Sequence, residues 1–248
     1  MKKLYIVLFL NCIILSEAQE SIQTDRPDQT ESVSITPRNH IQIETGLLFE
    51  KQDRDAERFL YPTILWKFGL NENVEIRLET EFLTQKEGAK NSTGLAPLTF
   101  GFKAKLVEEQ KFIPNISFLG NLKTNKLGSK NFQTSYLAPA FRFLFDHTLS
   151  DKLNLGYNLG AEWDGESPAA TGIYTLAAGY SFTEKLSGFA EVYGLINKYT
   201  KADHRFDTGF TYLLNNNFML DTSVGFGLSK VSPEYFLSCG FSYRFPLK

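Results

Sequence analysis

Residues 153–163 read LNLGYNLGAEW, an unbroken alternation of apolar residues with polar residues or glycine. Residues 74–82, VEIRLETEF, repeat this alternation and place four charged residues on one side. Successive side chains of a strand point to opposite faces, whereas a helix would scatter those charges among apolar neighbours. Both segments are therefore predicted to be β-strands with one apolar and one polar face.

Ten further segments follow the same period less cleanly, so the chain as a whole predicts about twelve strands. Residues 40–245 number 206, or about 17 per strand and connection, which suits the ~9–11 residues of a tilted membrane strand. The ten segments are His40–Glu50, Phe59–Leu70, Leu95–Val107, Phe112–Lys123, Phe132–Phe145, Ala170–Phe182, Leu186–Ile196, Arg205–Leu214, Phe218–Leu228 and Glu234–Phe245.

The connections alternate between two lengths along the chain. Short periplasmic turns and longer outer loops are typical of outer-membrane barrels. We therefore predict an all-β fold, a single antiparallel transmembrane β-barrel of about twelve strands in residues 40–248, with both termini in the periplasm. A secreted soluble β-sandwich is the alternative. The predicted tight turns are 71–73, 108–110, 150–151, 183–185 and 215–217, and longer connections include 85–94 and 124–130.

The apolar faces have the composition expected for contact with lipid. In a membrane barrel this face is an apolar band flanked by aromatic girdles, and the polar face lines the lumen. The last predicted strand places on one face Tyr235, Leu237, Cys239, Phe241, Tyr243 and Phe245. Other aromatic residues near predicted strand ends are Phe49, Phe59, Trp66, Phe68, Phe82, Trp163, Phe182 and Phe218.

The composition excludes several classes of protein. The chain has 248 residues, of which 42% are hydrophobic and 14% aromatic, enough apolar surface to exclude disorder. A formal net charge of −2 without a Lys/Arg cluster excludes a basic nucleic-acid binder, so no nucleic-acid partner is expected. Beyond the first residues, no stretch reaches the roughly 18 apolar residues that a spanning helix needs.

The N-terminus predicts export. The positively charged Lys2 and Lys3 precede an apolar run, which is followed by the small residues Ser16 and Ala18. Residues 1–18 are therefore predicted to be a secretory signal peptide cut after Ala18. A lipoprotein signal at Cys12 is the alternative, disfavoured by Asn11. Cleavage leaves Cys239 as the sole cysteine, so no intramolecular disulfide is expected.

Three motifs carry a resemblance to a known family. Residues 23–32 read QTDRPDQTES, residues 42–46 read QIETG, and residues 188–194 read GFAEVYG. Together they resemble the outer-membrane "MetA-pathway of phenol degradation" family, whose members are often described as transporters. The resemblance implies a transporter barrel, and the family's name implies aromatic solutes. One departure is the C-terminus, where Phe245 is followed by three further residues instead of ending the chain.

Residues 19–39 are predicted to form a periplasmic or lumenal segment, either a latch on the barrel wall or a plug that gates passage. Its candidate site residues are Thr24, Asp25, Arg26, Pro27, Asp28 and Glu31. Arg26 can bind a carboxylate in a bidentate manner, and its expected partner is a lumen carboxylate such as Glu44, Glu79 or Glu191.

The predicted lumen lining mixes both signs of charge, which does not indicate strong ion selectivity. The leading function is a channel or transporter for passive passage of small solutes, hydrophobic or aromatic ones among them. A non-conducting structural or adhesion barrel is the rival, and an outer-membrane hydrolase using His204 is a distant alternative. No cofactor or metal is expected, and the expected partners are outer-membrane lipid, the barrel-assembly machinery and the solute. The lining candidates are Glu44, Arg77, Glu79, Glu81, Lys103, Arg142, Glu162, Glu191 and Arg244.

Overall fold

The computed structural model describes residues 21–247, so the predicted signal peptide lies outside the described residues. These residues form strands and one short 3-10 helix, η1, at Lys130–Phe132. The strands are β1 His40–Lys51, β2 Ala56–Asn71, β3 Val74–Glu87, β4 Lys90–Leu95, β5 Thr99–Val107, β6 Asn115–Lys123, β7 Ala138–Ser150, β8 Leu153–Glu162, β9 Thr171–Ser181, β10 Leu186–Asn197, β11 Asp203–Asn215, β12 Phe218–Gly227 and β13 Tyr235–Pro246.

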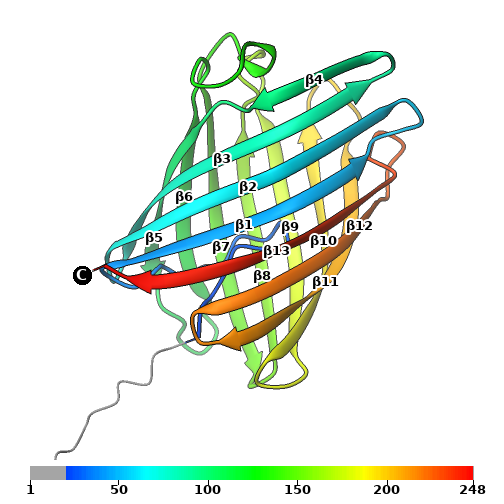
Figure 1. The fold of residues 1–248 in the computed structure, drawn as a ribbon. Coiled ribbons are helices and arrows are strands. Elements are labelled where there is room, and N and C mark those ends of the chain that lie inside the picture. The colour runs from blue at the N-terminus through cyan, green and yellow to red at the C-terminus, as the bar shows by residue number, and fades with distance from the viewer. Residues whose placement is uncertain (1–20, 248) are drawn as a thin grey trace, which may run out of the picture.

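The strands form one closed antiparallel barrel (Figure 1). Closure comes from β1, which pairs with β2 on one side and with β13 along its whole length on the other. β4 and β5 pair with successive parts of β3 and occupy one position in the wall, so thirteen strand segments make twelve wall positions. The predicted fold class and strand number are confirmed.

Two predicted boundaries are wrong. Residues 85–94, predicted as a loop, continue β3 into β4 as a hairpin that turns at Gly88, where φ is +57°. This hairpin lacks the apolar alternation that marks the other strands. The strand predicted from Phe132 begins at Ala138, because Phe132 packs on a small cluster of Leu60, Leu83 and Ala96 and holds its loop inward.

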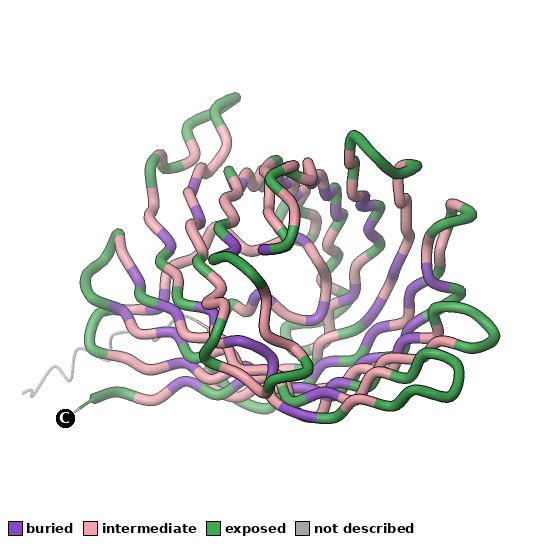
Figure 2. Tube along the Cα trace, turned by 90° about the horizontal axis from the view of Figure 1, so that it is seen from above, coloured by how far each residue is buried: buried purple, intermediate pink, exposed green. Residues whose placement is uncertain are grey.

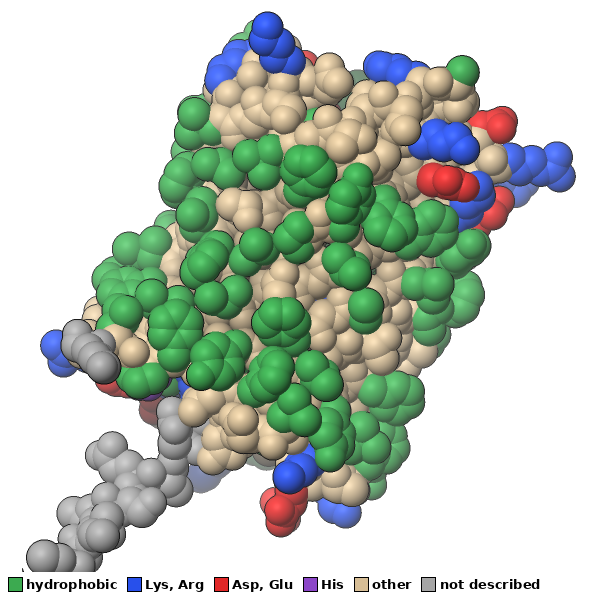
Figure 3. All heavy atoms as spheres, in the orientation of Figure 1, with side chains coloured by type: hydrophobic (Ala, Val, Ile, Leu, Met, Phe, Trp, Pro, Cys, Tyr) green, Lys and Arg blue, Asp and Glu red, His purple; other side chains and the backbone are tan. Residues whose placement is uncertain are grey.

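The interior of the barrel is polar and its exterior apolar. Among the largest fully buried side chains are Lys67, Lys103, Glu44 and Glu191. Figure 2 shows buried residues recurring along the strands, and Figure 3 shows hydrophobic side chains covering the face in view, with charged side chains at its two ends. This arrangement suits lipid outside and a hydrated lumen inside, as predicted. No helix among residues 21–247 is long and apolar enough to cross a membrane.

Both ends of the described chain lie at one rim of the barrel. The Leu247 amide donates to the Asn39 carbonyl at 2.7 Å, and the Ile22 amide donates to the carbonyl of Asn216 in the β11–β12 turn at 2.8 Å. We call this end, with the short turns at 72–73, 151–152 and 216–217, the terminal rim, and the opposite end the distal rim.

Candidate functional site

Residues 22–37, here called the lumen segment, lie inside the barrel. The segment leaves the terminal rim at Ile22, whose side chain is fully buried. It returns along the wall, where the Ser117 hydroxyl donates to the Val33 carbonyl at 2.7 Å and the Thr36 amide donates to Glu75 at 2.7 Å. The segment then enters β1 at His40. The sequence left this segment either in the periplasm or in the lumen; in this structure it lies in the lumen, in contact with strands from all around the wall.

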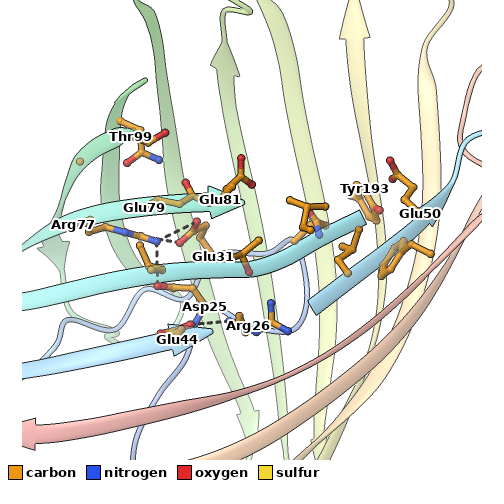
Figure 4. A pocket seen from close by; sticks show the side chains of 18 of the residues that line it. Asp25, Arg26, Glu31, Glu44, Glu50, Arg77, Glu79, Glu81, Thr99 and Tyr193 are labelled. Carbon is orange, nitrogen blue, oxygen red and sulfur yellow. Dashed lines mark hydrogen bonds and ion pairs between the residues drawn. The ribbon is translucent and has the colours of Figure 1, made fainter. Parts of the chain in front are cut away.

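Asp25 is the centre of a buried charge network, and Figure 4 shows the part of it formed with Arg77, Glu31 and Glu44. Its carboxylate accepts from Lys103 Nζ at 2.7 Å and from Lys67 Nζ at 2.8 Å, and it lies 3.4 Å from an Arg77 nitrogen. Lys67 also donates to Glu44 at 2.8 Å, and Glu44 in turn accepts the Asp25 amide at 2.9 Å. The three cations come from β2, β3 and β5, and Asp25 contacts all of them.

The charge network holds Asp25 ionised. Burial alone would raise the pKa of this carboxyl, but Lys103, Lys67 and Arg77 outweigh it and hold the pKa well below its usual range. A carboxylate surrounded by cations in a low-dielectric site is stable only while its partners remain in place. The lumen segment therefore supplies the negative charge that three lumen cations require.

Arg26 binds the wall on the other side of β1, at β12 and β13. Its guanidinium pairs with Asp221 on β12 at 2.8 Å and donates to Ser238 on β13 at 3.0 Å. Gly46 and Gly240 face each other across β1 and β13 beneath the guanidinium, and a Cβ on either would overlap Arg26. Arg26 thus pairs with a lumen carboxylate, as expected, but the partner is Asp221 and none of the three named examples, Glu44, Glu79 and Glu191. The contact between Arg26 and Glu44 is made by the Arg26 backbone amide, which donates to the Glu44 carboxylate at 3.2 Å.

The middle of the segment is fixed to β8, β9 and β10. Glu191 accepts the Gln29 amide at 2.7 Å and the Thr30 hydroxyl at 2.5 Å. Asn158 accepts the Glu31 amide at 2.7 Å. Glu44 and Gly46 in QIETG and Glu191 in GFAEVYG thus all contact QTDRPDQTES, so the three motifs are parts of one site.

The other predicted site residues also lie in the lumen, though not all at this site. Glu31 pairs with Arg77 at 2.8 Å, and Thr24 donates to the Arg26 carbonyl at 2.7 Å. Arg142 donates to the Gln29 carbonyl at 3.1 Å, while Arg244 bonds Asn217 at the terminal rim. Residues that line open cavity instead of pairing closely with the segment are Glu79, Glu81 and Glu162.

Sequence reasoning missed Lys67 and Asp221. Lys67 lies between Trp66 and Phe68, and the strand alternation changes its face at an irregularity in register between Leu60 and Thr63. A period-2 pattern assigns faces only within an unbroken strand. Asp221 stands alone among apolar and hydroxyl residues on β12, and its inward position follows from its register partner Gly240.

Removing the Arg26 guanidinium should loosen the segment measurably. Arg26→Ala leaves Asp221 buried without its charged donor, which costs about 1.5–3 kcal/mol for a charge-assisted hydrogen bond. Gly46→Ala should reproduce the loss, because the three atoms nearest to its methyl group would all belong to the Arg26 guanidinium. The temperature at which the SDS-resistant folded band converts to the unfolded band measures both, with exposed Arg54→Ala as the matched control. An Arg26→Ala temperature equal to the control would contradict this assignment.

The lumen segment divides the barrel interior. On its distal side lie adjoining cavities of about 320 and 390 Å³, which share Glu31, Glu79, Thr99 and Asn121 in their lining. We call these two cavities together the vestibule. On the terminal side lies a smaller cavity of about 180 Å³, the terminal cavity, between the segment and β7 to β10. The lumen segment stands between the two.

The vestibule has walls of two kinds. In the first cavity the apolar residues are Leu48, Leu60, Leu65, Tyr193 and Phe236, and in the second they are Leu119, Ala138, Ala140, Phe141 and Trp163. The part formed by β3, β5 and β6 is polar and is lined by Glu79, Glu81, Thr99, Asn121 and Lys123. Volumes of this order are typical of sites for small molecules, at ~300–1,000 Å³.

The arrangement that a hydrolase would need at His204 is not formed. The His204 ring bonds the Tyr174 hydroxyl at 2.7 Å, whereas the Asp203 carboxylate binds Arg205 and the Ser232 hydroxyl. Activating water requires a base held by its orienting partner beside a nucleophile. Among residues 21–247, no group of His, Cys, Asp and Glu is arranged to hold a metal ion.

Comparison with known proteins identifies relatives by family and by fold. The model of the family described as MetA-pathway of phenol degradation matches residues 24–245. An outer membrane channel from Pseudomonas putida F1 has a similar structure, with a TM-score of 0.67 and 12% identity over 89% of this chain and 99% of that one. Comparison with curated proteins found no match.

Two porins share the fold at greater distance. The KdgM porin in complex with oligogalacturonate has a TM-score of 0.56 and 14% identity, over 83% of this chain and 99% of the porin. The NanC porin has a TM-score of 0.55 and 9% identity, over 82% of this chain and 98% of the porin. At these identities the likeness concerns the barrel architecture.

Proposed function

The chain belongs to the MetA-pathway of phenol degradation family, and we propose that it is an outer-membrane channel for the passive passage of small solutes. The observation that carries this proposal is a closed barrel whose lumen holds cavities on both sides of one peptide segment. A barrel of this kind conducts when the segment moves, because the remaining lumen is polar and hydratable. The terminal rim is then periplasmic and the distal rim extracellular, and residues 1–18 direct export.

The vestibule favours solutes that combine an apolar part with polar groups. Tyr193 and Phe236 offer ring contacts, while Glu79 and Asn121 line the polar part of the wall. Small aromatic compounds with polar substituents have this chemistry, which agrees with the family's name. The similar structures, an outer membrane channel from P. putida F1 and two porins, support passive transport over catalysis. We propose no enzymatic role.

Solute uptake into proteoliposomes tests the proposal. Phenylalanine, a zwitterion with an apolar ring, should enter faster than sucrose through the full chain and through a variant lacking residues 22–34. The larger, wholly polar sugar gains nothing from the apolar wall. Protein-free liposomes are the control.

The rival function, a structural or adhesion barrel, is favoured by the same plugged lumen. It predicts that neither solute enters through either protein, even though the barrel resists SDS until heated. That outcome would overturn the channel. Binding of outer-membrane lipid and recognition by the barrel-assembly machinery remain proposals that follow from the barrel and its apolar exterior.

A further inference from the structure

The partition between the two cavities is thinnest at one turn of the lumen segment. Asp28 and Glu31 both line the vestibule and the terminal cavity, so movement of this turn would join them. Glu31 is held by Arg77 at 2.8 Å and lies 3.7 Å from Lys103. Asp28, by contrast, forms no ion pair with any described residue. The weak point of the partition is therefore an acidic side chain without a cation.

The wall beside Asp28 is also acidic, since Glu191 accepts the amide of the next residue, Gln29, at 2.7 Å. Glu191 on β10 and Asp207 on β11 are direct register partners, and their side chains are 1% and 0% exposed. No donor group of a described residue reaches either carboxyl oxygen of Asp207. Two buried carboxylates side by side cannot both remain ionised at little cost, so a proton shared between them is the natural way to satisfy Asp207.

The charges that act most strongly on Asp28 are negative. Asp25 and Glu31 of the same segment add negative charge, and the Arg142 guanidinium of β7 acts on Glu191 instead. The Tyr193 ring of β10 lies against Arg205 of β11, whose guanidinium carbon is 6.0 Å from the ring centroid. Burial raises the pKa of Asp28 well above its usual range, and the negative charge of Glu191 is the next largest cause.

We propose that Asp28, Glu191 and Asp207 form a proton-dependent latch that holds the Asp28 turn across the lumen and releases it as the pH rises. The latch rests on the proposed function, since its release opens the solute path between vestibule and terminal cavity. Bound protons let three carboxyl groups share one buried site. When these protons are lost, Asp28 on the segment and the carboxylates on the wall carry like charges. The two repel each other, so the turn moves out toward water.

The direction of the pH effect follows from linkage. A carboxyl whose pKa is raised in the docked position takes up a proton on docking, so docking is strongest below the usual pKa of Asp, about 3.9. Docking then weakens as the pH rises from that value through the raised pKa. Each proton released lowers the docking equilibrium by up to about tenfold per pH unit.

A spin label on the turn tests the latch without using conductance. The label is attached to Gln29→Cys in a Cys239→Ser background, because Gln29 contacts the wall through backbone atoms and Cys239 is exposed outside the barrel. Between about pH 5 and about pH 9, the mobile fraction should rise by tenfold or more. Asp28→Asn, which cannot ionise, should hold the label immobile throughout, and Asp207→Asn should remove most of the response.

The controls separate failure of the latch from failure of the channel. Asp151→Asn, an exposed acid in the β7–β8 turn, should keep the wild-type response. If the label is immobile at every pH while the variant lacking residues 22–34 conducts, the channel stands and the latch is overturned. If label mobility follows the prediction and no variant conducts, the latch stands and the channel fails. An Asp28→Asn label as mobile at high pH as the wild type would also overturn the latch.

Discussion

A variant that lacks residues 22–34 is expected to conduct ions several-fold better than the full chain in planar bilayers. The deletion removes the peptide between the vestibule and the terminal cavity and leaves the twelve-position wall intact. Lys67, Lys103 and Arg77 then face a hydrated lumen, where water and counter-ions replace Asp25 and Glu31. The barrel should still migrate as a compact band in SDS before heating.

The result also distinguishes the two roles that the sequence left open. Unchanged conductance with conversion to the unfolded band at a lower temperature would make the segment a latch on the wall. If neither conductance nor heat resistance changes, the segment does not occupy the lumen in the membrane. The Arg54→Ala variant, altered in an exposed loop, controls for the effect of substitution on insertion.

Asp25→Asn should destabilise the docked segment more than any other single isosteric change in it. The change leaves two ammonium groups, of Lys67 and Lys103, buried around a neutral amide. Removing one partner of a buried ion pair costs about 3–5 kcal/mol. Adding Lys103→Met to Asp25→Asn should recover part of this loss, because an apolar side chain needs no counter-charge.

Asp28→Asn is the matched control for this prediction. Like Asp25→Asn, it replaces a carboxylate of the lumen segment by an amide. The carboxylate of Asp28, however, forms no ion pair with a described residue. The measurement is the conversion temperature of the folded band, together with the conductance of each variant. Equal losses for Asp25→Asn and Asp28→Asn would contradict the charge network.

Acid should act on Asp25 in the opposite direction to its effect on Asp28. The cations hold the pKa of Asp25 well below its usual range in the docked position. Its contribution to docking is therefore present above the usual pKa, about 3.9, and disappears only as the pH falls through the lowered value. The segment should consequently be released by strong acid as well as by alkali.

The sequence by itself determined the barrel and most of its lining. Period-2 alternation assigned the outward face of β13 and the inward positions of Glu79 and Arg77, because strand geometry fixes which side chains share a face. Residues 23–32 were marked as a site by their resemblance to a family motif, and their four charged residues indicated that the segment binds the periplasmic rim or the lumen wall.

Only the tertiary structure decided which groups meet. Arg26 and Asp221 are 195 residues apart and come together through closure of β1 on β13, which local alternation does not encode. The inward position of Lys67 depends on the irregularity near Pro62, and the pairing of Glu191 with Asp207 depends on the register of two strands. A periodic pattern specifies faces, whereas partners across a lumen are set by closure, register and the space left by Gly46 and Gly240.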